Sequence, residues 1–248
     1  MWRGNLEPSS SYGIGTFSAS GNYNAYGNIM SLLYYDNYYS SQLDSTKHKK
    51  VFYRLFESDT HLLSAPLLPS TTLANECYNG MFMDCKSLIA APKLPATTLK
   101  YYCYAYMFSL CYSLTIAPEL PATSLASRCY DSMFYHCTSL ITAPSLPATT
   151  LVDYCYYRMF YGCSNLVTAP ELPATSLVDD CYSSMFYDCT QLNYIKALFK
   201  TNPSNSRTGE WVSGVASTGT FVKSSAATWT TTGVNGIPKG WTVVTDNQ

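Results

Sequence analysis

Apolar positions recur with a 26-residue step along the central part of the chain, from Leu62 to Gln191. Five successive copies fit the one-letter pattern L-x-x-A-P-x-L-P-x-T-x-L-x-x-x-C-Y-x-x-M-F-x-x-C-x-x. A strict period between about 20 and 50 residues is typical of solenoid proteins, in which each copy is one coil stacked on the previous one. Since no coil can bury its apolar face alone, we expect every copy to cover its neighbours.

One copy, residues 140–165, illustrates the elements that the pattern predicts. Leu140–Ala143 is short and partly β-branched, which favours a brief strand. Pro144 and Pro147 fix φ and lack a backbone donor, so the segment around them should be extended and should form a corner.

The second half of the copy predicts a helix. Thr150 and Asp153 are spaced like an N-cap hydroxyl and its capping-box acid, as are Ser176 and Asp179 in the next copy. Apolar residues then follow at steps of about four, the spacing of one helix face. We therefore expect an α/β solenoid of five 26-residue coils, each with a short strand, a proline corner and two to three helical turns.

The segments outside the five copies predict caps. Residues 1–50 lack the repeat and are read as an N-terminal cap, and a partial copy begins at Val51, so the array spans residues 51–200. Residues 201–248 predict a C-terminal β cap with short strands over 211–215, 219–223, 227–232 and 241–244. Trp211, Trp229 and Trp241 would pack this cap over the last coil, with a ligand platform as the alternative.

All cysteines lie in the copies, two in each, spaced C-x7-C. Zinc sites need closer C-x2-4-C pairs, and a helical C-x7-C pair is too far apart for a disulfide. Two ladders of buried thiols are the favoured interpretation, while bridges between coils or a metal stay open as alternatives. We expect no metal and no cofactor. The ladder residues are Cys77, Cys85, Cys103, Cys111, Cys129, Cys137, Cys155, Cys163, Cys181 and Cys189.

The run Met133-Phe134-Tyr135-His136-Cys137-Thr138-Ser139-Leu140 resembles the Ala-Phe-x-x-Cys-x-x-Leu core of BspA-like leucine-rich repeats. Leu146-Pro147 looks like the Ile-Pro of that family, whose copies are commonly shorter. The resemblance covers residues 51 to about 198. The segments 27–34 and 236–243 also resemble caps of relatives from gut Bacteroidetes and their phages. It implies a surface-exposed, adhesive or receptor-contacting protein without catalytic activity.

Composition narrows the classes of partner. Only 12% of the residues are charged, and 15 basic residues nearly balance 16 acidic ones, which argues against binding nucleic acid. No apolar stretch is long enough to span a membrane, so we expect no membrane insertion. Residues 1–8 contain no apolar core of a signal peptide. We expect an extracellular, cell-surface or virion-surface location, reached from a longer exported protein or as part of a virion.

No catalytic motif is present, and His48, His61 and His136 have no partner at ligand spacing. We therefore expect no enzymatic activity. Columns that vary between copies should face solvent, and near the middle of the array they are rich in Tyr and Arg, which are favoured at interface hot spots. The candidate binding residues are Tyr102, Tyr106, Arg128, Tyr154, Tyr157 and Arg158. They predict a binding or adhesion module for an extracellular protein or glycan; the alternatives are a structural spacer or decoration protein of a phage virion or tail fibre, and an ordinary Tyr-rich surface.

Overall fold

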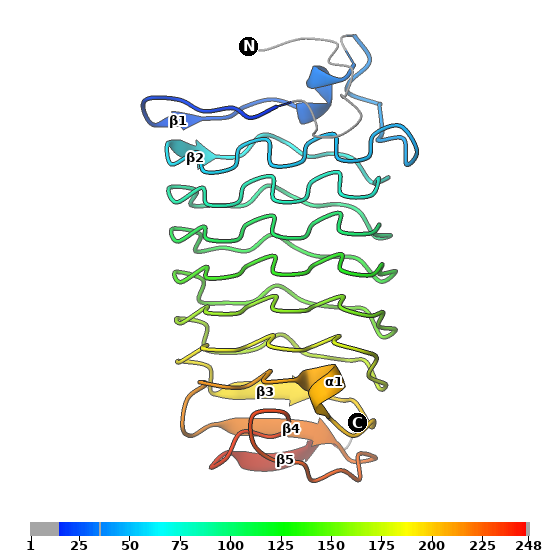
Figure 1. The fold of residues 1–248 in the computed structure, drawn as a ribbon, viewed down its shortest axis with the longest axis vertical. Coiled ribbons are helices and arrows are strands. Elements are labelled where there is room, and N and C mark those ends of the chain that lie inside the picture. The colour runs from blue at the N-terminus through cyan, green and yellow to red at the C-terminus, as the bar shows by residue number, and fades with distance from the viewer. Residues whose placement is uncertain (1–14, 35, 247–248) are drawn as a thin grey trace.

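The computed structural model describes residues 15–34 and 36–246. Residues 1–8, from which the absence of a signal peptide is read, lie outside the described residues. Figure 1 shows successive coils along the long axis of the molecule, with β1 and β2 near one end and β3, β4 and β5 at the other. The elements are β1 (Tyr23–Asn24), η1 (Ile29–Leu32, a 3-10 helix), β2 (Leu62–Ser64), β3 (Tyr194–Ala197), α1 (Asn205–Thr208), β4 (Thr220–Ser224) and β5 (Thr242–Asp246).

Neighbouring copies are joined by parallel backbone pairing at one fixed place in each copy. The strand expected over Leu140–Ala143 is reduced to a single bridging residue, Thr142, which pairs with both Ile116 and Thr168. The same contact continues through Ser64, Ala90, Ile116, Thr142, Thr168 and Tyr194, a step of 26 residues each time. At the C-terminal end it widens into a parallel sheet of order β3-β4-β5. The hydrogen bonds of this face therefore run along the stack.

The opposite face of each copy is a chain of overlapping turns, residues 126–137 in the third copy, which we call the turn ribbon together with its equivalents in the other copies. Every second backbone N–H closes a turn within the copy, as Cys129 donates to the carbonyl of Ala126 at 3.1 Å. The N–H groups between them donate to the next copy, as Phe134 does to the carbonyl of Met159 at 2.9 Å. The ribbon thus satisfies half its donors locally and half along the stack.

The helix predicted in each copy is wrong. An α-helix would bond each N–H to the carbonyl four residues earlier, whereas the ribbon uses three-residue steps and bonds between copies. Every fourth residue is left-handed, with φ of 57° at Arg128, 53° at Ser132 and 54° at His136. The ribbon therefore places two residues inward and the next two outward, and this period of four resembles one helix face in the sequence. Between residues 51 and 200 no helix is assigned.

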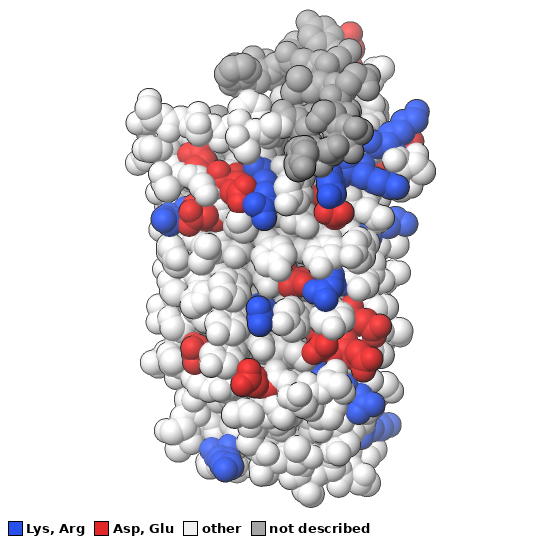
Figure 2. All heavy atoms as spheres, in the orientation of Figure 1, with Lys and Arg blue, Asp and Glu red and all other residues white. Residues whose placement is uncertain are grey.

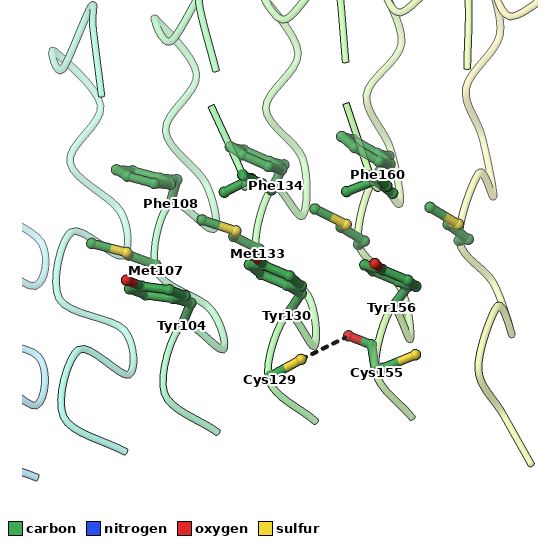
Figure 3. Close-up of a cluster of buried hydrophobic side chains, with 14 of the residues drawn as sticks. Tyr104, Met107, Phe108, Cys129, Tyr130, Met133, Phe134, Cys155, Tyr156 and Phe160 are labelled. Atoms are coloured by element: carbon green, nitrogen blue, oxygen red, sulfur yellow. Dashed lines mark hydrogen bonds between the residues drawn. The ribbon is translucent and has the colours of Figure 1, made fainter. Parts of the chain in front are cut away.

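The inward residues stack into continuous ladders (Figure 3). The rings of Phe134 and Phe160 lie nearly parallel with centroids 5.5 Å apart, and those of Tyr104 and Tyr130 are 6.0 Å apart. All ten cysteines are free and buried. Thiols of the second ladder donate to a phenylalanine carbonyl of the preceding copy, as Cys137 Sγ does to Phe108 at 3.0 Å. The dry interior thus consists of rings, thioethers and thiols packed copy on copy.

The two ends extend the stack by different means. Before the array, β1 pairs in parallel with β2, and η1 buries Ile29 and Met30. After it, the segment expected as a strand over 211–215 is another stretch of turn ribbon, with left-handed residues at Glu210 and Gly214, so that expectation is wrong.

Of the other strands expected in the C-terminal cap, 219–223 and 241–244 correspond to β4 and β5, and 227–232 forms no strand. Trp211 is fully buried and stacks with Tyr182, with ring centroids 6.3 Å apart. The indole N–H groups of Trp229 and Trp241 donate to the carbonyls of Phe199 and Ala216. The three tryptophans thus pack the end of the stack, and they form no open platform.

Candidate binding surface

The outward residues of the turn ribbon form three columns, which we call the left-handed columns. Every non-glycine residue with positive φ that the structure describes belongs to one of them. Side chains in this backbone region are fixed at regular intervals along the stack. The first column holds Lys50, Glu76, Tyr102, Arg128, Tyr154 and Asp180; the second Arg54, Gly80, Tyr106, Ser132, Arg158, Ser184 and Glu210; the third Ser58, Asp84, Leu110, His136, Gly162, Asp188 and Gly214.

Arg128 occupies the centre of the candidate surface, between the tyrosines of the two neighbouring copies. Its Cζ lies 3.8 Å from the ring centroid of Tyr154 and 5.6 Å from that of Tyr102. Its Nη1 also lies 2.9 Å from a carboxylate oxygen of Asp131, whose side chain is fully buried. The Ser132 hydroxyl donates to the other oxygen of the same carboxylate at 2.8 Å. Arg128 is thus held from both sides and from below, which fixes the tyrosines around it.

The electrostatics of the surface follow from partial burial. Burial raises the pKa of Asp131, against the opposing hydrogen bonds from Ser132 and Arg128. Burial also raises the pKa of Tyr102 and of Tyr106, while a hydrogen bond to the Asp180 carboxylate raises that of Tyr154. The tyrosines therefore present neutral hydroxyls at physiological pH, able to donate and to accept.

The remaining candidates continue the cluster into the next copy. Cζ of Arg158 lies 4.8 Å from the ring centroid of Tyr157, and Tyr157 meets Tyr154 edge-on at 5.6 Å. Five of the six sequence-derived candidates are thus linked by ring contacts from Tyr102 to Arg158. Tyr106 lies in the second column and is 36% exposed, with no printed ring contact to the other five.

Sequence reasoning missed a second row of aromatic side chains beside this cluster. The rings of Tyr135 and Tyr161 stack at 4.9 Å, and those of Tyr161 and Tyr187 stack at 4.6 Å. Arg158 reaches this row as well, with Cζ 5.9 Å from the centroid of Tyr161. The signal was present, because the three tyrosines stand 26 residues apart, but pairs of variable columns were read without comparing the same column along the stack.

The chemistry of these groups favours binding. Burial raises the pKa of every ladder thiol, to about 12 for Cys77 and further for Cys103, so these thiols stay protonated at neutral pH. His136 meets the edge of the Tyr135 ring at 4.5 Å. Among the described residues, no three or more metal-binding side chains come together.

The candidate surface is open. The two best-formed hollows lie at the ends of the stack, one of about 670 Å³ beside β1 and one of about 540 Å³ near Val212 and Lys239. Charged groups are sparse on the face drawn in Figure 2, and blue and red atoms often lie close together. Such a surface suits an extended partner better than an enclosed small molecule.

Comparisons of the chain with protein-family models, curated proteins and solved structures find no match. In the part of the chain that the structure describes, no helix has the length and apolarity needed to cross a membrane.

Proposed function

We propose that this chain is a non-enzymatic binding module displayed outside the cell or on a virion, contacting an extracellular protein or glycan through the Tyr- and Arg-rich columns of its repeat array. The scaffold would be a BspA-like leucine-rich-repeat solenoid over residues 51–200, with an N-terminal cap over 1–50 and a C-terminal cap over 201–248. Parallel bridges at a 26-residue step support such an array.

The observation that carries the proposal is the arrangement around Arg128. A surface built only for solubility has no need to hold an arginine between two tyrosine rings and anchor it on a buried carboxylate. Because these side chains are ordered before a partner arrives, little conformational entropy is lost on binding. Tyr and Arg are also the residues most enriched at interface hot spots.

A structural spacer is the second candidate, and one observation favours it. The ladders and the backbone bonds between copies continue without interruption from Phe52 to Trp211. A rod of this kind can set a distance without recognising anything. The two proposals differ in whether the outward tyrosines affect any interaction.

Arrays of extracellular proteins and of glycans test the proposal. We expect hits that Tyr102→Ala, Tyr106→Ala and Tyr157→Ala each weaken by tenfold or more, which corresponds to about 1.4 kcal/mol. Tyr112→Ala is the matched control, because Tyr112 is about as exposed as Tyr106 and lies outside the left-handed columns. An empty array, or hits that all four variants leave unchanged, would favour the spacer.

A further inference from the structure

The left-handed columns contain four basic residues, and three of them have an acidic partner within the chain. Lys50 Nζ lies 3.3 Å from Glu76, Arg54 lies 2.9 Å from Glu57 and Arg128 lies 2.9 Å from Asp131. Arg158 is exposed, and no ion pair is found for it among the described residues.

The difference has a local cause in the sequence. In the two paired arginines, the acid stands three residues later, at Glu57 for Arg54 and at Asp131 for Arg128. The residue three after Arg158 is Tyr161. The guanidinium is held beside the Tyr157 and Tyr161 rings, with Cζ 4.8 and 5.9 Å from their centroids. The place that an acid occupies in the other copies is therefore filled by a ring.

The acids near Arg158 do not replace the missing partner. Asp131 is close enough for Arg158 to lower its pKa, but it is buried and already accepts hydrogen bonds from Arg128 and Ser132. Asp188 acts on Tyr161 from the next copy, and its ionic interaction with Arg158 is not among the ion pairs of the described residues. Along its own column Arg158 stands between Ser132 and Ser184, both uncharged and buried. The guanidinium thus keeps N–H donors for an outside acceptor.

We propose that Arg158 receives a carboxylate from an acidic segment of a protein partner, a Glu or Asp side chain bound by the guanidinium beside the Tyr157 and Tyr161 rings. This inference rests on the proposed binding function and makes Arg158 its specificity-determining residue. A planar guanidinium binds a carboxylate through two parallel hydrogen bonds, which selects against amides and neutral side chains.

A protein segment fits this place better than an acidic sugar. Sugar rings bind tyrosine by stacking on an open ring face, but Tyr161 is stacked between Tyr135 at 4.9 Å and Tyr187 at 4.6 Å. What the row offers to a partner is ring edges and hydroxyls. The mixture of Tyr, Ser and Arg on an open surface is typical of sites that bind proteins.

A peptide library displayed on phage tests the inference with the whole chain as the target. Pools selected on the wild type should be enriched in peptides with Asp or Glu at one position, and Arg158→Met should weaken their binding at least tenfold. Changing that Asp or Glu of a selected peptide to Asn or Gln should weaken wild-type binding by the same factor and leave binding to Arg158→Met unchanged. Equal losses on both proteins would overturn the assignment.

A second pair of variants keeps Arg158 and supplies the missing acid from within. Tyr161→Glu should build the i, i+3 ion pair found at Arg54 and Arg128, and so should abolish the preference for acidic peptides. Tyr161→Gln has the same size without the charge and should retain that preference. If both variants lose acidic peptides to the same extent, the tyrosine ring and not a free guanidinium determines binding, and the inference fails.

The outcomes separate this inference from the proposed function. Peptides that require Tyr157 but show no acidic preference would leave the binding function standing and overturn the role of Arg158. Binding of uronic acid or sulfated glycans through Arg158, without acidic peptides, would also overturn it, because the source of the anion would be wrong. If neither peptides nor arrayed proteins and glycans bind the wild type, both proposals fall.

Discussion

The inner and outer sides of the turn ribbon share one backbone and differ in what they tolerate. Inward positions repeat the same Cys, Tyr, Met and Phe in all five copies, and each of these side chains is buried. Outward positions have the same φ from copy to copy yet hold Tyr, Arg, Ser, Asp, Leu or His. Because the bonds between copies use backbone groups alone, the outer side chains can change without altering the stack. The difference teaches that scaffold and surface are specified separately.

The thiol ladders should make the inner side fail at high pH, and this is the largest expected effect. Burial raises the pKa of Cys77, Cys85 and Cys181 from 9.0 to about 12, so these thiols stay protonated in the folded chain while they ionise in the unfolded one. The unfolded state then binds fewer protons, so their contribution to stability is complete below pH 9 and is lost as the pH rises toward 12. At about 1.4 kcal/mol per thiol and pH unit, these three alone would remove about 8 kcal/mol by pH 11.

Urea unfolding at intervals from pH 7 to 11 measures the loss, followed by circular dichroism. The same ladders should protect the thiols from Ellman's reagent at pH 8 in the folded chain and release all of them in denaturant. Prompt reaction of the native chain would mean that the thiols are open to solvent, and the inner side would then be no drier than the outer.

Exchanging one ring on each side is the most direct comparison. Phe134 is fully buried and stacks with Phe108 at 5.7 Å and Phe160 at 5.5 Å, so Phe134→Ala leaves a cavity between two copies. We expect a loss of about 3–5 kcal/mol in the free energy of unfolding. Tyr157→Ala, on the outer side, should change it by less than about 0.5 kcal/mol. Chemical denaturation of both variants gives the two values, and losses of similar size would abolish the distinction between the sides.

Much of the inner side was readable from the sequence, and the path of the backbone was not. Positions that repeat every 26 residues must meet their equivalents in the next copy, so Cys129, Met133 and Phe134 could be recognised as core residues. The helix was predicted because an inward pair at every fourth position resembles a helix face. Only glycines such as Gly80 and Gly162 hinted at left-handed backbone, since Tyr, Arg and Asp occupy most of those places.

The candidate surface was predictable as a region and not as a set of contacts. Variation between copies located Tyr102, Arg128 and Tyr154 on one face, where the structure brings them together. That Arg128 is paired while Arg158 has no ion pair depends on which side chain stands three residues later, and this spacing has meaning only once the ribbon geometry is known. The role of Asp131 was hidden for the same reason, because it belongs to a variable column and is nevertheless buried.

The smallest expected effect tests the left-handed backbone of the outer side. Ser58 is exposed and has φ of 59°, a conformation that disfavours a residue with a Cβ by about 1–2 kcal/mol. Ser58→Gly relieves this strain and gives the unfolded chain more freedom, which offsets about 0.5–1 kcal/mol of the gain. We expect a net stabilisation of about 0.5–1 kcal/mol in chemical denaturation, from the same two terms. Ser145→Gly is the matched control, because Ser145 is also exposed but is outside the positive-φ residues, and it should destabilise the chain by about 0.5–1 kcal/mol. Opposite signs for two serine-to-glycine changes can arise only if the outer columns are left-handed, so equal losses would remove the strain that sets the outer side apart from the inner.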